Sequence, residues 1–258
     1  MEPIDALSTT IDELDDLLKK EKQITNELRA NKVGVNGEML EKIQAYIYEK
    51  KDELDSIIDS LDITTDQVDT LQGETPLIIL SRYGDIDCIT RLIQRGYDIH
   101  SEINRTTPQR VTALMMASAF GRLDVVNTLL MYKPDMNITD TQERSALAYA
   151  ALRNHQKIAL VLIDHGAELN PNMYSSPLYN AVLKNHYTMV VLLVKKGAVF
   201  KEILEILRDG VLHRPDILEY LESQVPIRTP EKSKSKKRRV GGYTKRRHTK
   251  RVVNKKLT

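Results

Sequence analysis

Three kinds of side chain in this sequence could carry chemistry: one thiol, six imidazoles and a dense run of cations near the C-terminus. The thiol, Cys88, lies within the apolar stretch IDCITRLI. One cysteine excludes an intrachain disulfide and a multi-cysteine metal site. An apolar setting favours a buried, unreactive thiol over a nucleophile.

The acid and imidazole side chains form no catalytic pattern. Asp164 and His165 are adjacent, but consecutive residues of a helix point about 100° apart, and no nucleophile accompanies them. The sequence has no phosphate-binding glycine loop, no His-Glu-x-x-His and no Gly-x-Ser-x-Gly. We therefore expect no catalytic residue, no metal site and no cofactor, and a protein that is not an enzyme.

The cations are concentrated at one end of the chain. Residues 232–258 contain thirteen Lys or Arg and no acid, whereas residues 1–72 contain 18 acids and 8 bases. The middle, residues 73–231, is nearly balanced, with 18 acids and 17 bases. An acidic beginning and a basic end imply partners of opposite sign at the two ends, or one end that masks the other.

The elements that would position these side chains begin with a helical hairpin. Apolar residues recur at steps of three and four over residues 5–30 and 38–61, which is typical of amphipathic helices. Two glycines and two asparagines in NKVGVNG turn the chain between them. Lys50 fills a seam position where the apolar pattern has a gap. The hairpin must bury its apolar stripe, either as a structural cap or as a coiled coil that dimerises or binds a partner.

An internal repeat follows the hairpin and is the strongest signal in the sequence. Four segments of twenty-six residues align without gaps, and their starts lie 37, 33 and 31 residues apart. The segments are 75–100, 112–137, 145–170 and 176–201. Length varies only in the connections, which is what stacked supersecondary units tolerate.

Shared positions predict the structure of each unit. A Thr or Ser can cap a first helix, and a Gly or Asn follows where that helix should end in a left-handed residue. These residues are Thr75, Thr112, Ser145 and Ser176 for the caps, and Gly84, Gly121, Asn154 and Asn185 for the ends. A second, reversed helix completes the unit. The predicted fold class is therefore all-α, a solenoid of stacked helix-turn-helix units.

The repeated pattern resembles the ankyrin repeat, whose consensus runs T-P-L-H-x-A, then G-H, V-V-x-L-L-L and G-A-D-V-N. Gly166-Ala167-Glu168-Leu169-Asn170 is close to its ending, and the resemblance covers residues 62–201. The consensus His of T-P-L-H is absent from all four units, which implies a divergent and less stable array. His155 and His186 fall where the family has a structural His, so we expect them to pack and cap turns.

The resemblance also implies where a protein partner binds. In the family, partners contact the connector hairpins and two exposed positions near the end of each first helix. The corresponding residues here are Tyr83, Phe120, Arg153 and Lys184 on the helices, and Thr139, Thr141 and Gln142 on a connector. The alternative for Tyr83 and Phe120 is that both rings only cover neighbouring repeats.

The basic end allows four interpretations. A cluster resembles a nuclear import signal that an import carrier reads: Lys236, Lys237, Arg238, Arg239, Lys245, Arg246 and Arg247. Thirteen cations could instead bind nucleic acid non-specifically through counterion release or lie on an anionic membrane surface. They could also act as a solubilising run, or as one folded back on the acidic N-terminal hairpin. The same stretch also resembles the ends of proteins from large DNA viruses.

The sequence thus predicts four parts: an acidic helical hairpin (1–61), four ankyrin-like repeats (62–201), a C-terminal helical cap (202–224) and a disordered basic tail (225–258). No apolar run approaches eighteen residues, and Glu2 and Asp5 replace the cations of a signal peptide. We therefore expect no membrane insertion and a place inside the cell, in nucleus or cytoplasm. The predicted function is a non-catalytic interaction protein; the alternative is a nucleic-acid-associated protein that binds through its tail.

Overall fold

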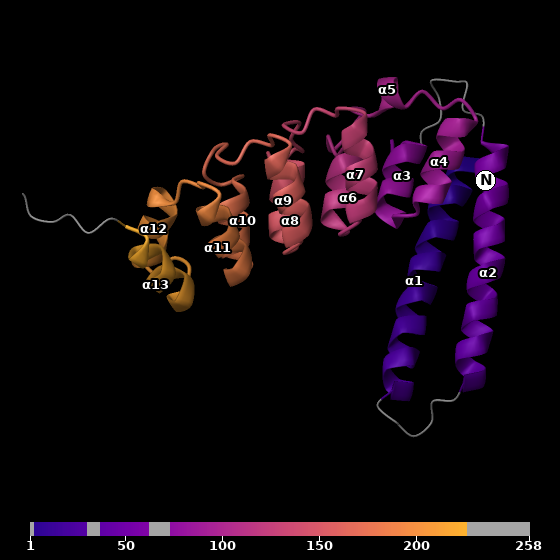
Figure 1. Ribbon diagram of the computed structural model, residues 1–258, viewed down its shortest axis with the longest axis horizontal. Helices are drawn as coiled ribbons and strands as arrows, with labels where there is room; N and C mark the ends of the chain where they lie inside the picture. Colours follow the sequence, from indigo (N-terminus) through magenta and orange to yellow (C-terminus); the bar gives the residue numbers. More distant parts are fainter. Residues whose placement is uncertain (1–2, 30–36, 62–72, 226–258) are drawn as a thin grey trace, which may run out of the picture. The chain divides into compact units, whose positions relative to one another are not determined.

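The computed structural model of the chain describes residues 3–29, 37–61 and 73–225. These residues form thirteen α-helices and no strand, which confirms the all-α prediction. A long pair, α1 (Pro3–Arg29) and α2 (Gly37–Ser60), comes first, and shorter helix pairs follow side by side (Figure 1). The predicted basic tail lies outside the described residues, except for Val225.

Each repeat contributes a first and a second helix. The first helices are α3 (Pro76–Tyr83), α6 (Ala113–Ala119), α8 (Ala146–Leu152) and α10 (Pro177–Leu183). The second helices are α4 (Ile86–Gln94), α7 (Leu123–Met131), α9 (Gln156–Asp164) and α11 (Tyr187–Lys195). First helices pack in the order α3, α6, α8, α10, and a further pair, α12 (Lys201–Arg208) and α13 (Pro215–Ser223), packs through α13 on α11.

The predicted caps explain where the first helices begin and end. The side-chain oxygens of Thr75, Thr112, Ser145 and Ser176 each accept a hydrogen bond from the backbone N–H three residues on. The residues at the far end have positive φ: 95° at Gly84, 75° at Gly121, 62° at Asn154 and 60° at Asn185. Both predictions are confirmed, and together they give every repeat the same start and the same reversal.

Small residues let the first helices approach closely. Ala117, Ala150 and Ala181 are fully buried at equivalent positions. One turn earlier on the same faces lie Leu114, Leu147 and Leu178, which are also buried. A core of alternating small and large apolar residues therefore runs through the stack.

The N-terminal hairpin packs where a preceding repeat would stand, with α1 on α3 and α2 on α4. Its residues Leu7, Ile11, Leu14, Leu54 and Ile58 are almost completely buried. Ion pairs border this apolar contact: Arg82 with Asp12 at 3.5 Å, Arg122 with Asp15 at 3.2 Å, and Arg91 with Asp55 at 3.0 Å and Asp59 at 2.6 Å. This packing supports the structural-cap alternative for the hairpin.

Lys50 replaces an apolar residue in the seam between α1 and α2. Its side chain is only 14% exposed, and its Nζ lies 2.6 Å from Oε2 of Glu13 and 2.9 Å from Oε2 of Glu53. Hydrogen bonds to Glu13 and Glu53 raise the pKa of Lys50, so the ammonium keeps its charge at the seam. The side chain is thus mostly covered while its charged tip is paired.

The ungapped alignment was wrong at the end of the first repeat. It paired His100 with Asn137, but a short helix, α5 (Ile99–Glu102), is inserted there, and Asp98 caps it by accepting from His100 N at 3.1 Å. The residue that does what Asn137 does is Asn104. Asn104 accepts from Asp135 N at 2.8 Å, as Asn137 accepts from Glu168 N at 3.0 Å.

Candidate functional site

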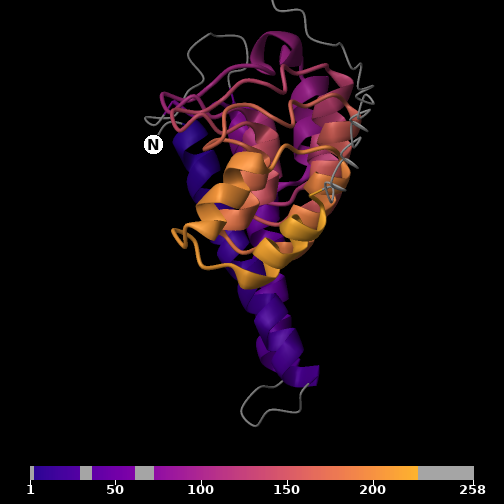
Figure 2. The same cartoon turned by 90° about the vertical axis from the view of Figure 1, so that its left-hand side faces the viewer.

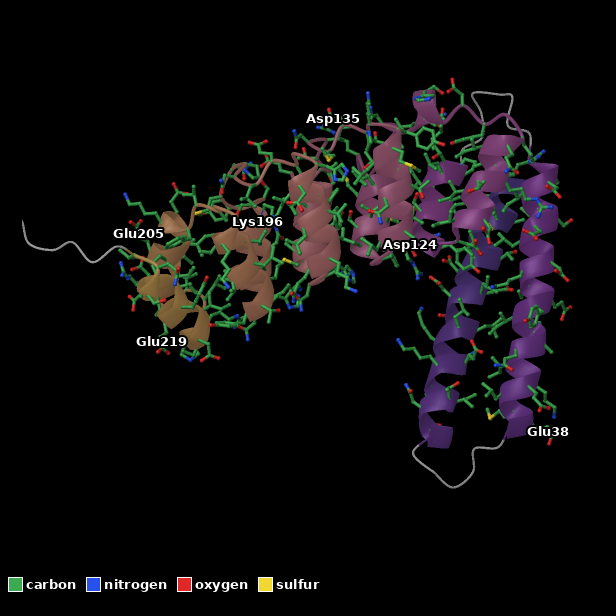
Figure 3. The ribbon with its side chains drawn as sticks, viewed as in Figure 1. Glu38, Asp124, Asp135, Lys196, Glu205 and Glu219 are labelled. Carbon is green, nitrogen blue, oxygen red and sulfur yellow. The ribbon has the colours of Figure 1, made fainter. Side chains whose placement is uncertain are left out.

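The stack of repeats has two edges, and the predicted site residues lie on both of them. The connector edge carries the links from one repeat to the next, with Asp135 as a labelled example, and the turn edge carries the links within each repeat, with Asp124 close by (Figure 3). Viewed from the end, the connectors gather at one side of the helix pairs (Figure 2). Residues that recur once per repeat therefore form rows along either edge.

Three of the predicted partner-binding residues form one row on the turn edge. Phe120, Arg153 and Lys184 are the C-cap residues of α6, α8 and α10, with φ of −95°, −105° and −89° and ψ of 3°, 3° and 2°. Nearly equal backbone angles direct their side chains equivalently in each repeat. Phe120 is 46% exposed, and Arg153 and Lys184 are also exposed.

Tyr83, which was expected to extend this row, is a correction. Its side chain is buried, with 6% exposure. Burial is the main cause that raises its pKa, and the charges acting on it include Asp15 of α1 as well as Arg122 of the next repeat. Because α1 covers this end of the stack, the position that is open in the second repeat is closed in the first. Tyr83 thus belongs to the core, as the alternative interpretation held.

Behind this row, side chains of each repeat bind backbone carbonyls of the repeat before it. His155 Nε2 lies 3.2 Å from Ala119 O, and His186 Nε2 lies 3.1 Å from Leu152 O. Both imidazoles are used in turn packing, as predicted, and lie in separate repeats.

Arginine takes the same role at the two ends of this series, which the sequence predictions missed. Arg122 Nε donates to Arg82 O at 2.9 Å, and Arg214 Nη2 donates to Leu183 O at 3.1 Å. The sequence did contain a signal for this role of Arg122: it directly follows Gly121, as His155 directly follows Asn154, so both occupy the same repeat position. These bonds hold adjacent repeats at a fixed spacing along the turn edge.

The lone cysteine has no reactive setting. Cys88 lies in α4 and is buried. Burial raises its pKa to about 12, so almost none of it is thiolate at neutral pH. The prediction of an unreactive thiol is confirmed.

The connector edge carries the other predicted residues, Thr139, Thr141 and Gln142. Thr141 and Gln142 are exposed and Thr139 is half-buried. Thr141 N donates to Gln109 O at 3.0 Å, so this connector is bonded to the one before it. The three side chains are therefore presented on a connector held in place by its neighbour.

A buried carboxylate organises this connector. Asp140 Oδ1 accepts from the backbone N–H of Gln142 and Arg144, both at 2.8 Å. Its Oδ2 accepts from Arg144 Nη2 at 2.6 Å and from Tyr149 OH at 2.7 Å. Burial alone would raise the pKa of Asp140, but hydrogen bonds from Arg144 and Tyr149 lower it below its usual value. The sequence predictions missed this network, which fixes the connector to α8.

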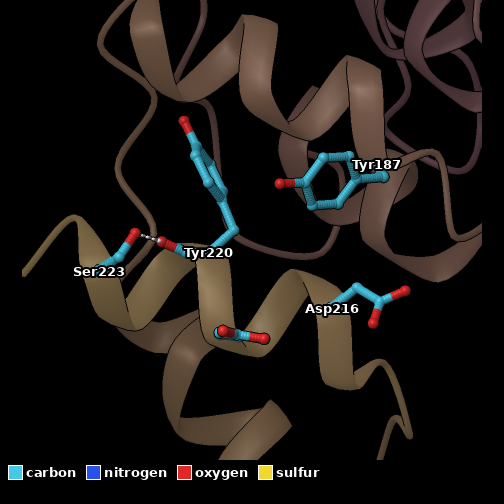
Figure 4. Close-up of a pocket in the computed structure, with 5 residues that line it drawn as sticks. Tyr187, Asp216, Tyr220 and Ser223 are labelled. Atoms are coloured by element: carbon cyan, nitrogen blue, oxygen red, sulfur yellow. Dashed lines mark hydrogen bonds between the residues drawn. The ribbon is translucent and has the colours of Figure 1, made fainter.

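Two of the hollows on the described residues lie near features discussed above. One, of about 290 Å³, lies beside the connectors, where Thr141, Gln142, Arg144 and Tyr149 contribute to its wall. The other, of about 510 Å³, lies between α11 and α13 (Figure 4). Two tyrosine rings line it, Tyr187 and Tyr220, with centroids 5.8 Å apart, together with Asp216, Glu219 and Ser223. Of these two hollows, the first includes the predicted residues Thr141 and Gln142 and the second includes none.

The seven predicted residues of the basic tail are not placed. Lys236, Lys237, Arg238, Arg239, Lys245, Arg246 and Arg247 all lie outside the described residues. Their role stays a prediction.

Stacked helix-turn-helix units with capped first helices, left-handed reversals and bonded connectors define the chain as a helical repeat solenoid. The family model of ankyrin repeats, in three copies, matches residues 36–140 and 129–203. Because these matches cover more than half of the sequence, the chain belongs to the ankyrin repeat family, and ankyrin repeats are protein–protein interaction modules. The first match begins just before α2, which agrees with the packing of the hairpin as if it were a repeat.

Two curated proteins are similar to parts of the chain. A protein of Rickettsia bellii that is named for its ankyrin repeats is 30% identical over 98 residues, which are 38% of this chain and 16% of the relative. The "Probable E3 ubiquitin-protein ligase XBOS32" of Oryza sativa subsp. japonica is 33% identical over 104 residues, which are 40% of this chain and 20% of the relative. The chain thus spans a fifth or less of either relative.

Among the described helices, none combines the length and the apolar character needed to cross a membrane.

Proposed function

We propose that the chain is a non-catalytic adaptor whose repeats bind a protein partner through Phe120, Arg153 and Lys184 on the turn edge. The observation that carries this proposal is a contrast in exposure between neighbouring residues at the end of each first helix. These three C-cap side chains are exposed and in line, whereas the residues two positions before the caps, Ser118, Ala151 and Val182, are fully buried. Exposed side chains in line on a rigid support can bind without the protein changing shape.

The test compares two triple variants of the full chain in its native cells. Phe120→Ala, Arg153→Ala and Lys184→Ala remove one large apolar group and two cations from the turn edge. Met131→Ala, Lys195→Ala and Lys201→Ala remove the same chemistry from exposed positions elsewhere. Proteins captured with the wild type should be lost with the first variant and retained with the second. Equal capture by both variants would refute the proposal.

We assign the connector residues Thr139, Thr141 and Gln142 to the rim of the same binding surface. Their support is the bond from Thr141 N to Gln109 O, which holds the connector in a defined position. Rim contacts contribute less than anchors, so alanine at all three should weaken capture less than the turn-edge variant. If the connector variant loses more partner capture than the turn-edge variant, the connector residues are the main binding contacts.

We propose that the basic tail directs the adaptor to its location in the cell. Its support is the sequence alone, thirteen cations without an acid. Deletion of residues 232–258 should change the distribution of the protein and leave partner capture unchanged. The alternative, a tether to nucleic acid, predicts instead a complex with DNA or RNA that weakens steeply with salt and disappears with the deletion. Absence of such a complex at low salt would eliminate the tether.

A further inference from the structure

Charge along the turn edge shows what kind of partner it fits. Residues 145–201 contain six Lys or Arg but only two acids, Asp164 and Glu168. Asp164 ends α9 and pairs with Lys196 at 2.7 Å, and Glu168 lies in the following connector, so both acids are on the connector edge. The turn edge of the third and fourth repeats is therefore basic.

Arg153 and Lys184 differ from Arg122 and Arg214 of the same edge, whose guanidinium groups bond backbone carbonyls. Arg153 and Lys184 are exposed and make no ion pair with any residue in the described ranges. Phe120 stands one repeat before Arg153 in the same row, and Leu183, which precedes Lys184, is 37% exposed. The row thus offers an apolar ring followed by two unpaired cations.

Lys157 stands at a helix position that disfavours a cation. It is the second residue of α9, and the second residues of α4, α7 and α13 are all acids: Asp87, Asp124 and Asp216. An acid is favoured there because the helix dipole is positive at the N-terminus, and a cation is disfavoured. An exposed lysine at this position therefore works against the helix and needs another reason, which a negatively charged ligand provides.

The spacing of the row limits the shape of that ligand. Packed helices lie about 8–10 Å apart, and α6, α8 and α10 are packed in succession. An extended chain in the polyproline II conformation has three residues per turn and rises about 3.1 Å per residue, so every third side chain lies on the same face, about 9 Å from the last, which is close to one repeat. A partner segment in this conformation would meet the row with every third side chain.

We propose that the turn edge of the second to fourth repeats binds an extended acidic segment of a partner protein, with an apolar residue on Phe120 and carboxylates three and six residues away on Arg153 and Lys184. The positive charge of Lys157 also attracts the carboxylate that binds Arg153. The inference rests on the proposed partner-binding role of this edge and adds the chemistry of the partner.

A polypeptide suits the edge better than a nucleic acid. A strand of duplex DNA carries a charge about every 3.4 Å, so two cations about one repeat apart would leave most phosphates unpaired. The basic stretch is also short, because Asp124 and Asp216, both exposed, stand at its two ends. Such flanking acids repel a long polyanion and accept a short segment.

The test uses labelled synthetic peptides and the full chain. One peptide has a phenylalanine with glutamates three and six residues later; a second has the same composition with glutamates two and four residues later. Binding of the first should be about three- to fivefold tighter, because only its carboxylates share one face of a polyproline II segment at the spacing of the repeats. Equal binding of both peptides, or no binding of either, would overturn the spacing argument.

Charge-reversal variants locate the site while the basic tail stays constant. Arg153→Glu with Lys184→Glu should weaken binding of the first peptide about tenfold, since each exposed pair loses its attraction and gains repulsion. Lys195→Glu with Lys201→Glu changes the net charge equally and should have no such effect. If an oligothymidine of equal charge loses affinity through the first pair and the peptide does not, the edge binds phosphates and the proposal is wrong.

Lys157→Glu separates binding from stability. This change should weaken the first peptide about threefold and raise the unfolding temperature, because the helix dipole favours the acid. A purely structural lysine would show no change in peptide binding. If the alanine variants of Phe120, Arg153 and Lys184 abolish partner capture while the peptides show no preference, only the acidic nature of the partner is refuted, and the proposed function stands.

Discussion

Replacing Tyr83 by alanine should destabilise the protein far more than the same change at Phe120. The two aromatic rings stand at equivalent positions of adjacent repeats, but Tyr83 is 6% exposed under α1 and Phe120 is 46% exposed. The comparison therefore measures how firmly the N-terminal hairpin covers the first repeat.

The magnitudes follow from burial. Truncating a buried aromatic residue removes its transfer free energy and leaves a cavity, which costs about 3–5 kcal/mol. Full burial of a phenylalanine side chain contributes about 1.5–3 kcal/mol, so a half-exposed ring contributes about 1 kcal/mol, and solvent fills the space it leaves. Each kcal/mol corresponds to about 2–4 °C for a chain of this size, so Tyr83→Ala should lower the unfolding temperature by about 6–20 °C.

The assay is urea unfolding of the full chain, followed by circular dichroism at 222 nm, with thermal unfolding beside it. Tyr83→Phe serves as a control that keeps the ring and should remain close to wild type. Equal losses at Tyr83 and Phe120 would mean that α1 does not cover the first repeat, and would refute the interpretation of the hairpin as a cap.

Three further changes test how the repeats are held together. Arg122→Ala leaves the Arg82 carbonyl without its side-chain donor and should cost about 1–3 kcal/mol of unfolding free energy, with partial recovery in Arg122→His. Gly121→Ala should cost about 1–2 kcal/mol in the same denaturation assay, because its φ is 75° and the added carbon would lie 2.7 Å from His155 Cε1. Asp140 has a pKa lowered below 3.8, so its stabilisation is present at neutral pH and is lost as the pH falls through that lowered value; the stability difference between wild type and Asp140→Asn should therefore shrink on acidification.

The sequence was sufficient for the features that depend on local chemistry. Caps such as Thr75 and reversals such as Asn154 are set by hydrogen bonds and φ preferences within a few residues, and the structure has both where they were predicted. The same holds for the buried thiol of Cys88, which follows from the apolar face on which it lies.

Features that depend on neighbouring elements could not be predicted in the same way. Tyr83 occupies the same repeat position as Phe120, and its burial depends on α1, more than fifty residues earlier in the chain. The insertion of α5 could not be predicted because it leaves the periodicity of the helices intact. It changes only which residue bonds the next repeat: Asn104 accepts from Asp135 N.

Among the candidate site residues, recurrence at one position per repeat located the row of Phe120, Arg153 and Lys184. It did not show which members are open, because exposure depends on what covers the end of the stack. The Asp140 network was missed for a related reason: it joins Arg144 and Tyr149 of one repeat, and no equivalent set recurs in the others to reveal it.

The central claim is that the turn edge binds a protein partner through exposed residues that the fold does not need. The most direct test is the dissociation constant of the captured partner for the Phe120→Ala, Arg153→Ala and Lys184→Ala variant, beside the unfolding free energy of the same protein. We predict at least about a tenfold weaker complex with little loss of stability. An unchanged dissociation constant, or weaker binding only in proportion to unfolding, would contradict the account.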